Sequence, residues 1–289
     1  MENKEIRMII GITGSSGSGK TTFSNILANK LNYQLINADE IVKKLYAKGE
    51  NYYSEIVKLF GTKILNNNQE INRKILAEMV FKNEEERQKL NNITFKYVVD
   101  EIKKQVEKNS IIDAPLLIES QLNTICDVTI SLIANEETKI KRIIKRDKIK
   151  ETSAKNRIEA QQKDEFYIKH SNYVIINNNV DLEKQVDDAV ELLRNNILNN
   201  PEIVIIQDKE TILLQFKKLL EYKELVHAFT LKPLNFGSNN TYEEIKDEVD
   251  NNYKLACNLL NIDYKNIIRP YQTHTNNIKE VTDEVRNIQ

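Results

Sequence analysis

The sequence predicts an α/β fold built around a mostly parallel sheet, and three observations favour it. A glycine-rich loop, Gly14 to Thr21, stands between an apolar run at residues 8–10 and a helical pattern at residues 22–28. Farther along, short apolar runs alternate with helical segments, which is typical of strand–helix–strand units with parallel strands. The run at residues 127–133 is almost continuously apolar, as expected for a strand covered on both faces.

The glycine-rich loop carries the clearest chemistry. Its sequence, Gly-Ser-Ser-Gly-Ser-Gly-Lys-Thr, matches the phosphate-binding pattern G-x-x-x-x-G-K-[ST]. A Gly/Ser-rich turn with a surface lysine is the alternative, and the strand before and helix after the loop argue against it. Lys20 is expected on the β- and γ-phosphates of ATP, and the Thr21 hydroxyl on Mg²⁺. The residues expected to contact ATP in this segment are Gly14, Ser16, Gly17, Ser18, Gly19, Lys20, Thr21 and Thr22.

Three acidic residues follow predicted strands, where a parallel sheet places its ligand crevice. Asp39 comes after the strand at residues 33–36, and it could accept a proton from an acceptor hydroxyl or help to hold Mg²⁺. Capping of a helix at residues 40–45 is an equally good interpretation of Asp39. Asp113 follows two isoleucines and is expected to touch Mg²⁺, and Glu119 lies in the next loop.

Arginines are expected to clamp phosphates. Residues 54–108 are helical almost throughout, which is too long for a single crossover and predicts an inserted substrate-binding subdomain with Arg73 as a candidate clamp. A helix at residues 136–148 carries Arg142 and Arg146 on one face, and Arg142 is expected to contact ATP. Arg157 and Gln161 repeat this spacing on a helix that ends near residue 170, so the pair of helices predicts a lid that neutralises the transferring phosphoryl group. The alternative is a solvated basic face paired with Glu136, Glu137 and Asp147.

The chain then closes with a strand at residues 173–177 and an amphipathic helix at residues 182–198. Asn177, at the end of that strand, could bind an edge of adenine. This order of strands and helices is that of a P-loop kinase fold with a parallel sheet, an inserted helical subdomain and a lid.

Residues 6–198 resemble the dephospho-CoA kinase family. The resemblance is carried by the loop at 14–21, by Ala38-Asp39, and by residues 70–81, 113–119, 142–161 and 173–177. It implies that Asp39 is the base for the ribose 3′-hydroxyl and that Arg146 contacts phosphates. Adenine is then expected near Asn177. Three positions depart from the family pattern: Asn37 replaces the first acid of Asp-Ala-Asp, Phe95-Lys96 replaces His-Pro, and Ser171-Asn172 replaces Ala-Asp.

This resemblance implies ATP- and Mg²⁺-dependent phosphorylation of dephospho-CoA to CoA, the last step of coenzyme A biosynthesis. Another P-loop nucleoside or nucleotide kinase is the alternative within enzymes, and a weakened nucleotide-binding module is the alternative outside them. Lys20, Asp39 and Arg146 are the expected catalytic residues. The acceptor is expected to contact Asp39, Arg73, Asp113, Glu119 and Arg157.

Composition limits the partners and the location. The net charge is −1, with acidic and basic residues interspersed, so nucleic acid and membranes are not expected partners. No apolar run has membrane-spanning length, and two widely spaced cysteines form no disulfide framework. We therefore expect a cytoplasmic enzyme, and the sequence carries no signal for its oligomeric state.

The remaining residues suggest a partial second domain of α+β type. Residues 199–202 are expected to be a linker, followed by strands at 203–206 and 225–230 and helices at 211–222 and 242–260. Residues 203–289 are similar to the amino-terminal part of the laccase-domain (multicopper-oxidoreductase-like) purine nucleoside phosphorylase family. The resemblance makes His274 one of three zinc ligands, but one histidine cannot make a zinc site. We therefore expect an incomplete domain of a fusion protein, which needs Zn²⁺ and phosphorolyses purine nucleosides only if completed elsewhere. A complete accessory domain or a dimerisation element are the alternatives.

Overall fold

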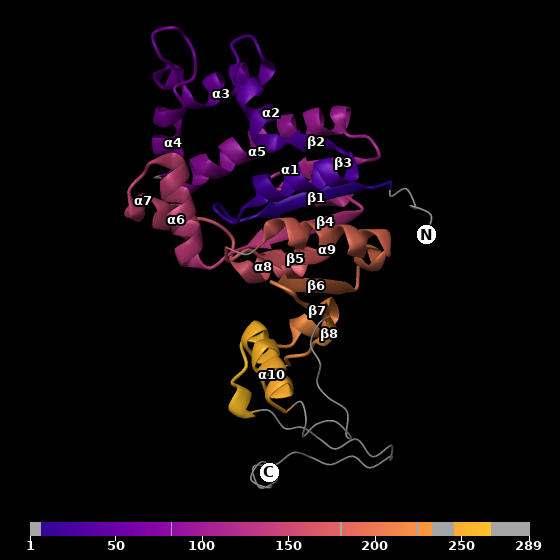
Figure 1. Cartoon of the computed structure of the whole chain (residues 1–289). Helices are drawn as coiled ribbons and strands as arrows, with labels where there is room; N and C mark the ends of the chain where they lie inside the picture. The colour runs from indigo at the N-terminus through magenta and orange to yellow at the C-terminus, as the bar shows by residue number, and fades with distance from the viewer. Residues whose placement is uncertain (1–6, 82, 180, 224, 233–245, 267–289) are drawn as a thin grey trace. The chain divides into compact units, whose positions relative to one another are not determined.

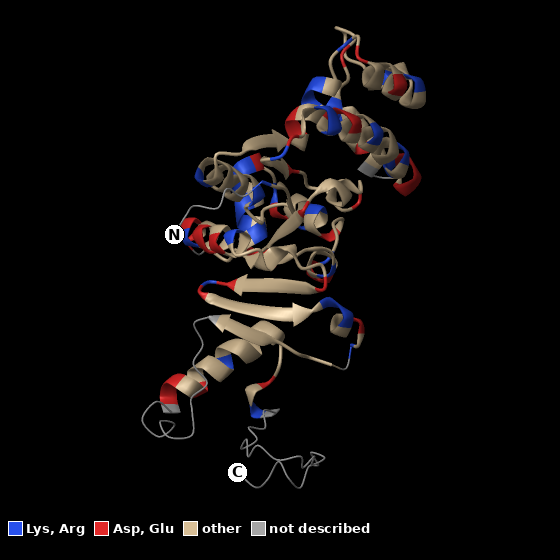
Figure 2. Ribbon diagram, turned by 90° about the vertical axis from the view of Figure 1, so that its right-hand side faces the viewer, with Lys and Arg blue, Asp and Glu red and all other residues tan. Residues whose placement is uncertain are grey.

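A computed structural model describes residues 7–81, 83–179, 181–223, 225–232 and 246–266 (Figure 1). The chain divides into two compact units, Met1–Leu231 and Lys232–Gln289. Within the described ranges, no helix combines the length and the apolar character needed to cross a bilayer. Lys and Arg alternate with Asp and Glu along the helices of the first unit, whereas its strands are mostly uncharged (Figure 2).

An eight-stranded sheet in the order β2-β3-β1-β4-β5-β6-β7-β8 organises the first unit (Figure 1). The pairs from β2 to β6 are parallel, and β6 pairs with β7 in the antiparallel direction. The sheet class predicted from the sequence is therefore confirmed. The strands are β1 (Ile9–Gly14), β2 (Gln34–Asn37), β3 (Ser110–Asp113), β4 (Val128–Ile133), β5 (Tyr173–Ile176), β6 (Ile203–Asp208), β7 (Thr211–Phe216) and β8 (Phe229–Lys232).

The strand register brings the candidate residues to one edge of the sheet. Asp113, at the end of β3, is opposite Ile12 of β1 on one side and Asn37 of β2 on the other. Gly14, at the end of β1, is opposite Leu132 of β4. Because all four strands run in the same direction, the phosphate-binding loop and the acids that follow β2 and β3 meet at the carboxyl edge.

Helices cover both faces of the sheet. Apolar residues of α1 and α9 pack against β1, β4, β5 and β6 in the largest hydrophobic cluster. On the opposite face α2 and α5 cover β2 and β3, and α8 covers β4, β5 and β6. The helices are α1 (Lys20–Leu31), α2 (Ala38–Leu45), α3 (Asn51–Phe60), α4 (Arg73–Phe81), α5 (Glu84–Gln105), α6 (Glu136–Asp147), α7 (Glu151–Glu159), α8 (Asp164–His170), α9 (Leu182–Arg194) and α10 (Lys246–Leu260).

The helical block between β2 and β3 has its own small core. Tyr52, Ile56 and Phe60 of α3 pack with Leu76 of α4 and with apolar residues of α5. This cluster is separate from the three clusters that lie against the sheet. The block therefore behaves as an inserted subdomain, with α5 joining it to the sheet.

The segment after Leu198 differs from the prediction. β6 pairs with β5, so the sheet continues through the expected linker and the compact unit ends at Leu231. The helix predicted at residues 211–222 is wrong, because β7 forms a hairpin with β6 and only residues 217–221 are helical, as a 3₁₀ turn. Cross-strand packing overrides the helical preference of Leu213 and Leu214. The turn at Lys209 lacks the Asn-Gly or Asp-Gly signal by which a hairpin is recognised.

The second unit contributes one described α-helix, α10, on which Cys257 is buried. His274 lies outside the described residues. In the part of the chain that the structure describes, no group of three His, Cys, Asp or Glu side chains is placed to hold a metal.

A buried polar chain ties β6 to the rest of the sheet, and its removal should destabilise the fold. Gln207 of β6 is 0% exposed, accepts a hydrogen bond from the Tyr173 hydroxyl, and donates to Asp188 Oδ2 of α9 at 2.6 Å. Gln207→Ala removes the hydrogen-bond partner of both Tyr173 and Asp188, and we expect a loss of about 1–3 kcal/mol in the free energy of unfolding. Urea unfolding measures this loss. Gln34→Ala, at an exposed position of β2, is the control. An equal loss of unfolding free energy in both variants would contradict a structural role for Gln207.

Candidate active site

Glycines give the phosphate-binding loop its close approach to neighbouring backbone. Gly14 has φ +133°, and a Cβ there would lie 2.0 Å from Leu132 O. Gly19 has φ +99°, and a Cβ there would lie 2.3 Å from Asn177 Nδ2. These backbone conformations strain any other L-residue. The loop therefore needs glycine at both positions, for its conformation and for space.

Gly19→Ala should therefore disable nucleotide binding. The added methyl group pushes Asn177 away and strains the loop, and we expect the Kd for ATP to rise at least about tenfold. Gly49 is a matched control because it has φ +101° with nothing within 4 Å of its Cβ position. Gly49→Ala should cost only the backbone strain, about 1–2 kcal/mol of stability. Equal ATP affinity in the two variants, measured by titration calorimetry, would show that the packing around Gly19 is irrelevant.

Lys20 lies folded back on the loop. Its Nζ donates to Ser15 O at 3.0 Å. Burial lowers the pKa of Lys20 below its ordinary value, and the nearby Asp113 and Asp39 carboxylates partly offset this shift. A bound phosphate would stabilise the charged form of Lys20, which burial disfavours. Lys20 thus lies near both acids, and its contact with the phosphates stays a prediction.

Thr21 and Asp113 meet at the carboxyl edge, as expected for the Mg²⁺ site. Asp113 is 2% exposed, and burial raises the pKa of its carboxyl group, whereas Lys20 and a hydrogen bond with Thr21 act in the opposite direction. Mg²⁺ takes oxygen ligands from one or two carboxylates together with substrate phosphates. A hydroxyl and a buried carboxylate beside a phosphate-binding loop fit that requirement. Thr21 and Asp113 are therefore the residues that would hold the ion.

Asp39 lies in the first turn of α2 and does not cap that helix. The N-cap of α2 is Asn37, whose side-chain oxygen accepts from Glu40 N at 3.1 Å and whose amide donates to Asp113 Oδ2 at 3.4 Å. The capping interpretation of Asp39 is thus wrong. Its carboxylate instead lies near Lys20 and Arg146 and lines a pocket. Asn37, which stands in place of the first acid of the Asp-Ala-Asp pattern, is therefore the residue that caps α2.

Arg142 binds the phosphate-binding loop directly. Its Nη1 donates to Gly17 O at 3.1 Å and to Ser18 O at 3.3 Å, and its Nη2 donates to Asn177 Oδ1 at 3.1 Å. The Asn177 amide also donates to Ser18 O at 2.9 Å. Arg142 and Asn177 therefore hold the loop from the side of β5. The adenine-binding role of Asn177 stays a prediction.

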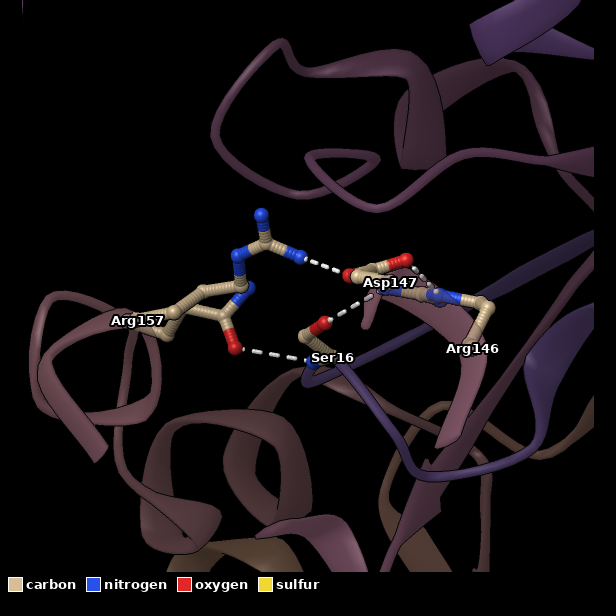
Figure 3. Close-up of polar contacts among 5 residues, drawn as sticks. Ser16, Arg146, Asp147 and Arg157 are labelled. Carbon is tan, nitrogen blue, oxygen red and sulfur yellow. Dashed lines mark hydrogen bonds and ion pairs between the residues drawn. The ribbon is translucent and has the colours of Figure 1, made fainter. Parts of the chain in front are cut away.

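Asp147 binds Arg146, the second arginine of the predicted lid, through two hydrogen bonds beside the phosphate-binding loop (Figure 3). Arg146 Nε and Nη2 donate to Asp147 Oδ1 and Oδ2 at 2.7 Å and 2.9 Å, and Nη2 lies 3.4 Å from Ser16 Oγ. Arg157 of α7 donates to the same Asp147 carboxylate. Asp147 thereby joins the two lid helices, and its pKa is lowered chiefly by the Arg146 hydrogen bonds. The Arg146 side chain is 59% exposed and pairs with Asp147, so the predicted phosphate contact of Arg146 stays a prediction beside the solvated-face alternative.

Two contacts of the lid were missed as site residues. Gln161 Oε1 accepts a hydrogen bond from Ser16 N at 2.8 Å, and the Asp147 carboxylate accepts hydrogen bonds from Arg146 and Arg157. Gln161 follows α7 instead of lying on one continuous helix, because α7 ends at Glu159 and α8 starts at Asp164. The spacing of Gln161 from Arg157 was a signal for the first contact. The Arg-Asp dipeptide was a signal for the second.

Arg73 and Glu119 have different surroundings. The Arg73 guanidinium lies 4.6 Å from the centre of the Tyr46 ring and donates to Lys43 O at 3.2 Å, so it is engaged within the helical subdomain. Glu119 lines a large cleft, has a buried oxygen with no hydrogen-bond partner, and has a pKa raised by burial. The predicted substrate contacts of both residues stay predictions, and the cleft favours Glu119.

Comparison with known proteins decides the family. A family model described as dephospho-CoA kinase matches residues 8–183, which span the loop, both acids and the lid. The chain belongs to the dephospho-CoA kinase family.

Individual relatives cover the same part of the chain. The dephospho-CoA kinase of Fusobacterium nucleatum is 40% identical over 192 residues, which make up 64% of this chain and 98% of that protein. Dephospho-CoA kinase CAB5 of Saccharomyces cerevisiae is 32% identical over 200 residues, covering 65% and 83%. The crystal structure of TT1252 from Thermus thermophilus aligns with a TM-score of 0.55 and 25% identity, covering 66% of this chain and 97% of that one.

The dephospho-CoA kinase match ends at residue 183, before β6. The resemblance of residues 203–289 to purine nucleoside phosphorylases therefore stays a prediction.

Within the matched region, a cleft of about 770 Å³ separates the helical subdomain from the lid. It is lined by α4, α5, the segment after β3 and α7, and it includes Arg87, Glu119 and Arg157.

Proposed function

We propose that this chain transfers the γ-phosphoryl group of ATP to the ribose 3′-hydroxyl of dephospho-CoA, giving CoA and ADP. The observation that carries the proposal is the meeting of Lys20, Asp39, Asp113 and Arg146 at one edge of the sheet in a chain of this family. Each of these side chains has a different task in phosphoryl transfer.

Positive groups act on the transferring phosphoryl. Lys20 leaves Ser15 O and pairs with the β- and γ-phosphates, because a phosphate is a better partner for an ammonium than a neutral carbonyl. The Asp147 fork holds Arg146 by one side of its guanidinium, which leaves its other N–H groups for phosphate oxygens. Fixed donors of this kind stabilise the charge of the transition state without reorganising during the reaction.

Asp39 accepts the proton of the acceptor hydroxyl. Its carboxylate faces Lys20 and Arg146, so a hydroxyl placed between Asp39 and the γ-phosphate can attack in line while Asp39 accepts its proton. Mg²⁺, when bound by Thr21 and Asp113, would neutralise charge on the β- and γ-phosphates. Asp39 thus acts on the acceptor, and Asp113 on the donor side.

The lid excludes water. α6 contacts the loop through Arg142 and Arg146, and the segment after α7 contacts it through Gln161. Closure over the phosphates keeps ATP from hydrolysis and sets the acceptor in place. The cytoplasm, where ATP and Mg²⁺ are available, is the compartment that we propose for the reaction.

ADP release measured with several acceptors tests the function. We expect turnover with dephospho-CoA, and none above background with nucleosides, nucleotides or shikimate. Turnover with a nucleoside alone would assign the chain to another group of P-loop kinases. No stimulation by any acceptor would leave only a nucleotide-binding module. Phosphorolysis of adenosine with added Zn²⁺, assayed on the same preparation, tests the predicted second domain, and we expect none.

A further inference from the structure

A small apolar pocket lies directly beside Asp39. Its volume is about 90 Å³, and it is formed by the start of α2, one side of α5 and the segment after β3. Asp39 is the charged side chain at this pocket. Its apolar walls include Val42, Phe95, Val98, Ala114, Leu116 and Leu122.

This pocket adjoins the large cleft. Phe95 and Leu116 line both, so the two spaces share a wall, whereas Asp39 lines the small pocket. The charged residues that line the large cleft are two arginines, Arg87 and Arg157, and two glutamates, Glu84 and Glu119. The site therefore offers an apolar compartment next to the predicted base and, beyond it, a polar compartment that includes two arginines.

The chemistry of the acceptor matches this division. In dephospho-CoA the reacting 3′-hydroxyl belongs to the ribose that carries adenine, and a diphosphate separates this ribose from the pantetheine arm. A hydroxyl at Asp39 therefore places the base within one sugar ring of that carboxylate and the arm farther away. We propose that the small pocket binds the adenine ring of the acceptor, with Phe95 as a specificity-determining wall. This inference rests on the proposed function.

Physical complementarity supports the assignment. A base has two apolar π-faces that stack on aromatic side chains, and half-buried Phe95 supplies a ring in the wall that the pocket shares with the large cleft. The diphosphate then reaches the cleft that holds Arg87 and Arg157. Arg87 pairs with Glu84 and Arg157 with Asp147, yet each guanidinium has five N–H donors, so donors remain for phosphate oxygens.

The donor nucleotide does not compete for this pocket. Asn177, the residue expected near the adenine of ATP, lies after β5 and contacts Arg142 of α6 and the phosphate-binding loop. The small pocket is instead built from α2, α5 and the segment after β3. A change at Phe95 should therefore alter the use of the acceptor without altering that of ATP.

Kinetics of Phe95→Ala with two acceptors test the proposal. The full-length chain is assayed with dephospho-CoA and with its 1,N⁶-ethenoadenine analogue, whose base carries an additional fused ring. We expect the wild type to prefer adenine. Phe95→Ala should raise the KM for dephospho-CoA about 5- to 100-fold, leave the KM for ATP unchanged, and reduce the preference for adenine over ethenoadenine. Phe95→Leu keeps apolar volume without the ring, and should show the same change if the alanine variant does not fold.

Phe216→Ala is the control, since it removes an equal ring at a 40%-exposed position on β7. An unchanged KM for dephospho-CoA in both Phe95 variants would overturn the proposal. Equal losses with both acceptors, which leave their ratio at the wild-type value, would also overturn it. Absence of wild-type turnover with dephospho-CoA would instead refute the proposed function, so the two failures are distinguishable.

Discussion

Arg146→Ala should lower kcat by about 10³-fold or more, which is the scale found when an arginine is removed from a phosphoryl-transfer transition state. Arg146 lies within electrostatic reach of both Lys20 and Asp39, and Asp147 fixes its orientation. The KM for ATP should change much less, because the loop and Lys20 hold the phosphates of the ground state. Steady-state kinetics with dephospho-CoA and ATP measure both effects.

Lys145→Ala is the matched control for this prediction. Lys145 is the preceding residue of α6 and is exposed. Loss of a charge there should change kcat by no more than about twofold. If the two variants lose activity equally, the effect of Arg146 comes from the net charge of the lid and not from contact with the phosphoryl group.

Asp39→Asn should lower kcat by about 10²- to 10⁴-fold, because an amide cannot accept the hydroxyl proton. The substitution keeps the size of the side chain at the start of α2, whose cap is provided by Asn37. ATP binding should therefore persist. Single-turnover measurements, with ATP affinity determined separately, distinguish a lost base from a lost binding site.

Glu40→Gln controls for the loss of negative charge in the first turn of α2. Glu40 is adjacent to Asp39 and exposed, and only its backbone N–H contacts Asn37. Its turnover should match the wild type. Wild-type turnover in Asp39→Asn would remove Asp39 from the mechanism and point to a proton acceptor among the phosphates.

Local sequence was sufficient for much of the site. The loop, Lys20 and Thr21 lie in one uninterrupted motif, and Asp113 was located because it follows an apolar run that had to be a strand. Parallel strands end at a common edge, so sequence order alone brought these residues together. Arg142 and Arg146 were found from helical spacing, since a helix fixes which residues share a face.

Contacts between distant segments were not accessible in this way. The role of Asp39 stayed ambiguous because both a cap and a base use the same residue type, and Asn37 decided the matter only through geometry. Arg73 could be placed on a helix but not against Tyr46. The sequence of β7 predicts a helix, whereas its pairing with β6, and not its own propensity, determines its conformation.

The position of the transferred phosphate is the most direct test of the account. Product formed from dephospho-CoA and ATP is isolated and examined by ³¹P NMR and mass spectrometry. We predict one added phosphoryl group on the ribose 3′-oxygen and one ADP released per product. A phosphate at any other position, or ADP formed without a phosphorylated acceptor, would contradict an active site in which Asp39 presents that hydroxyl to Lys20 and Arg146.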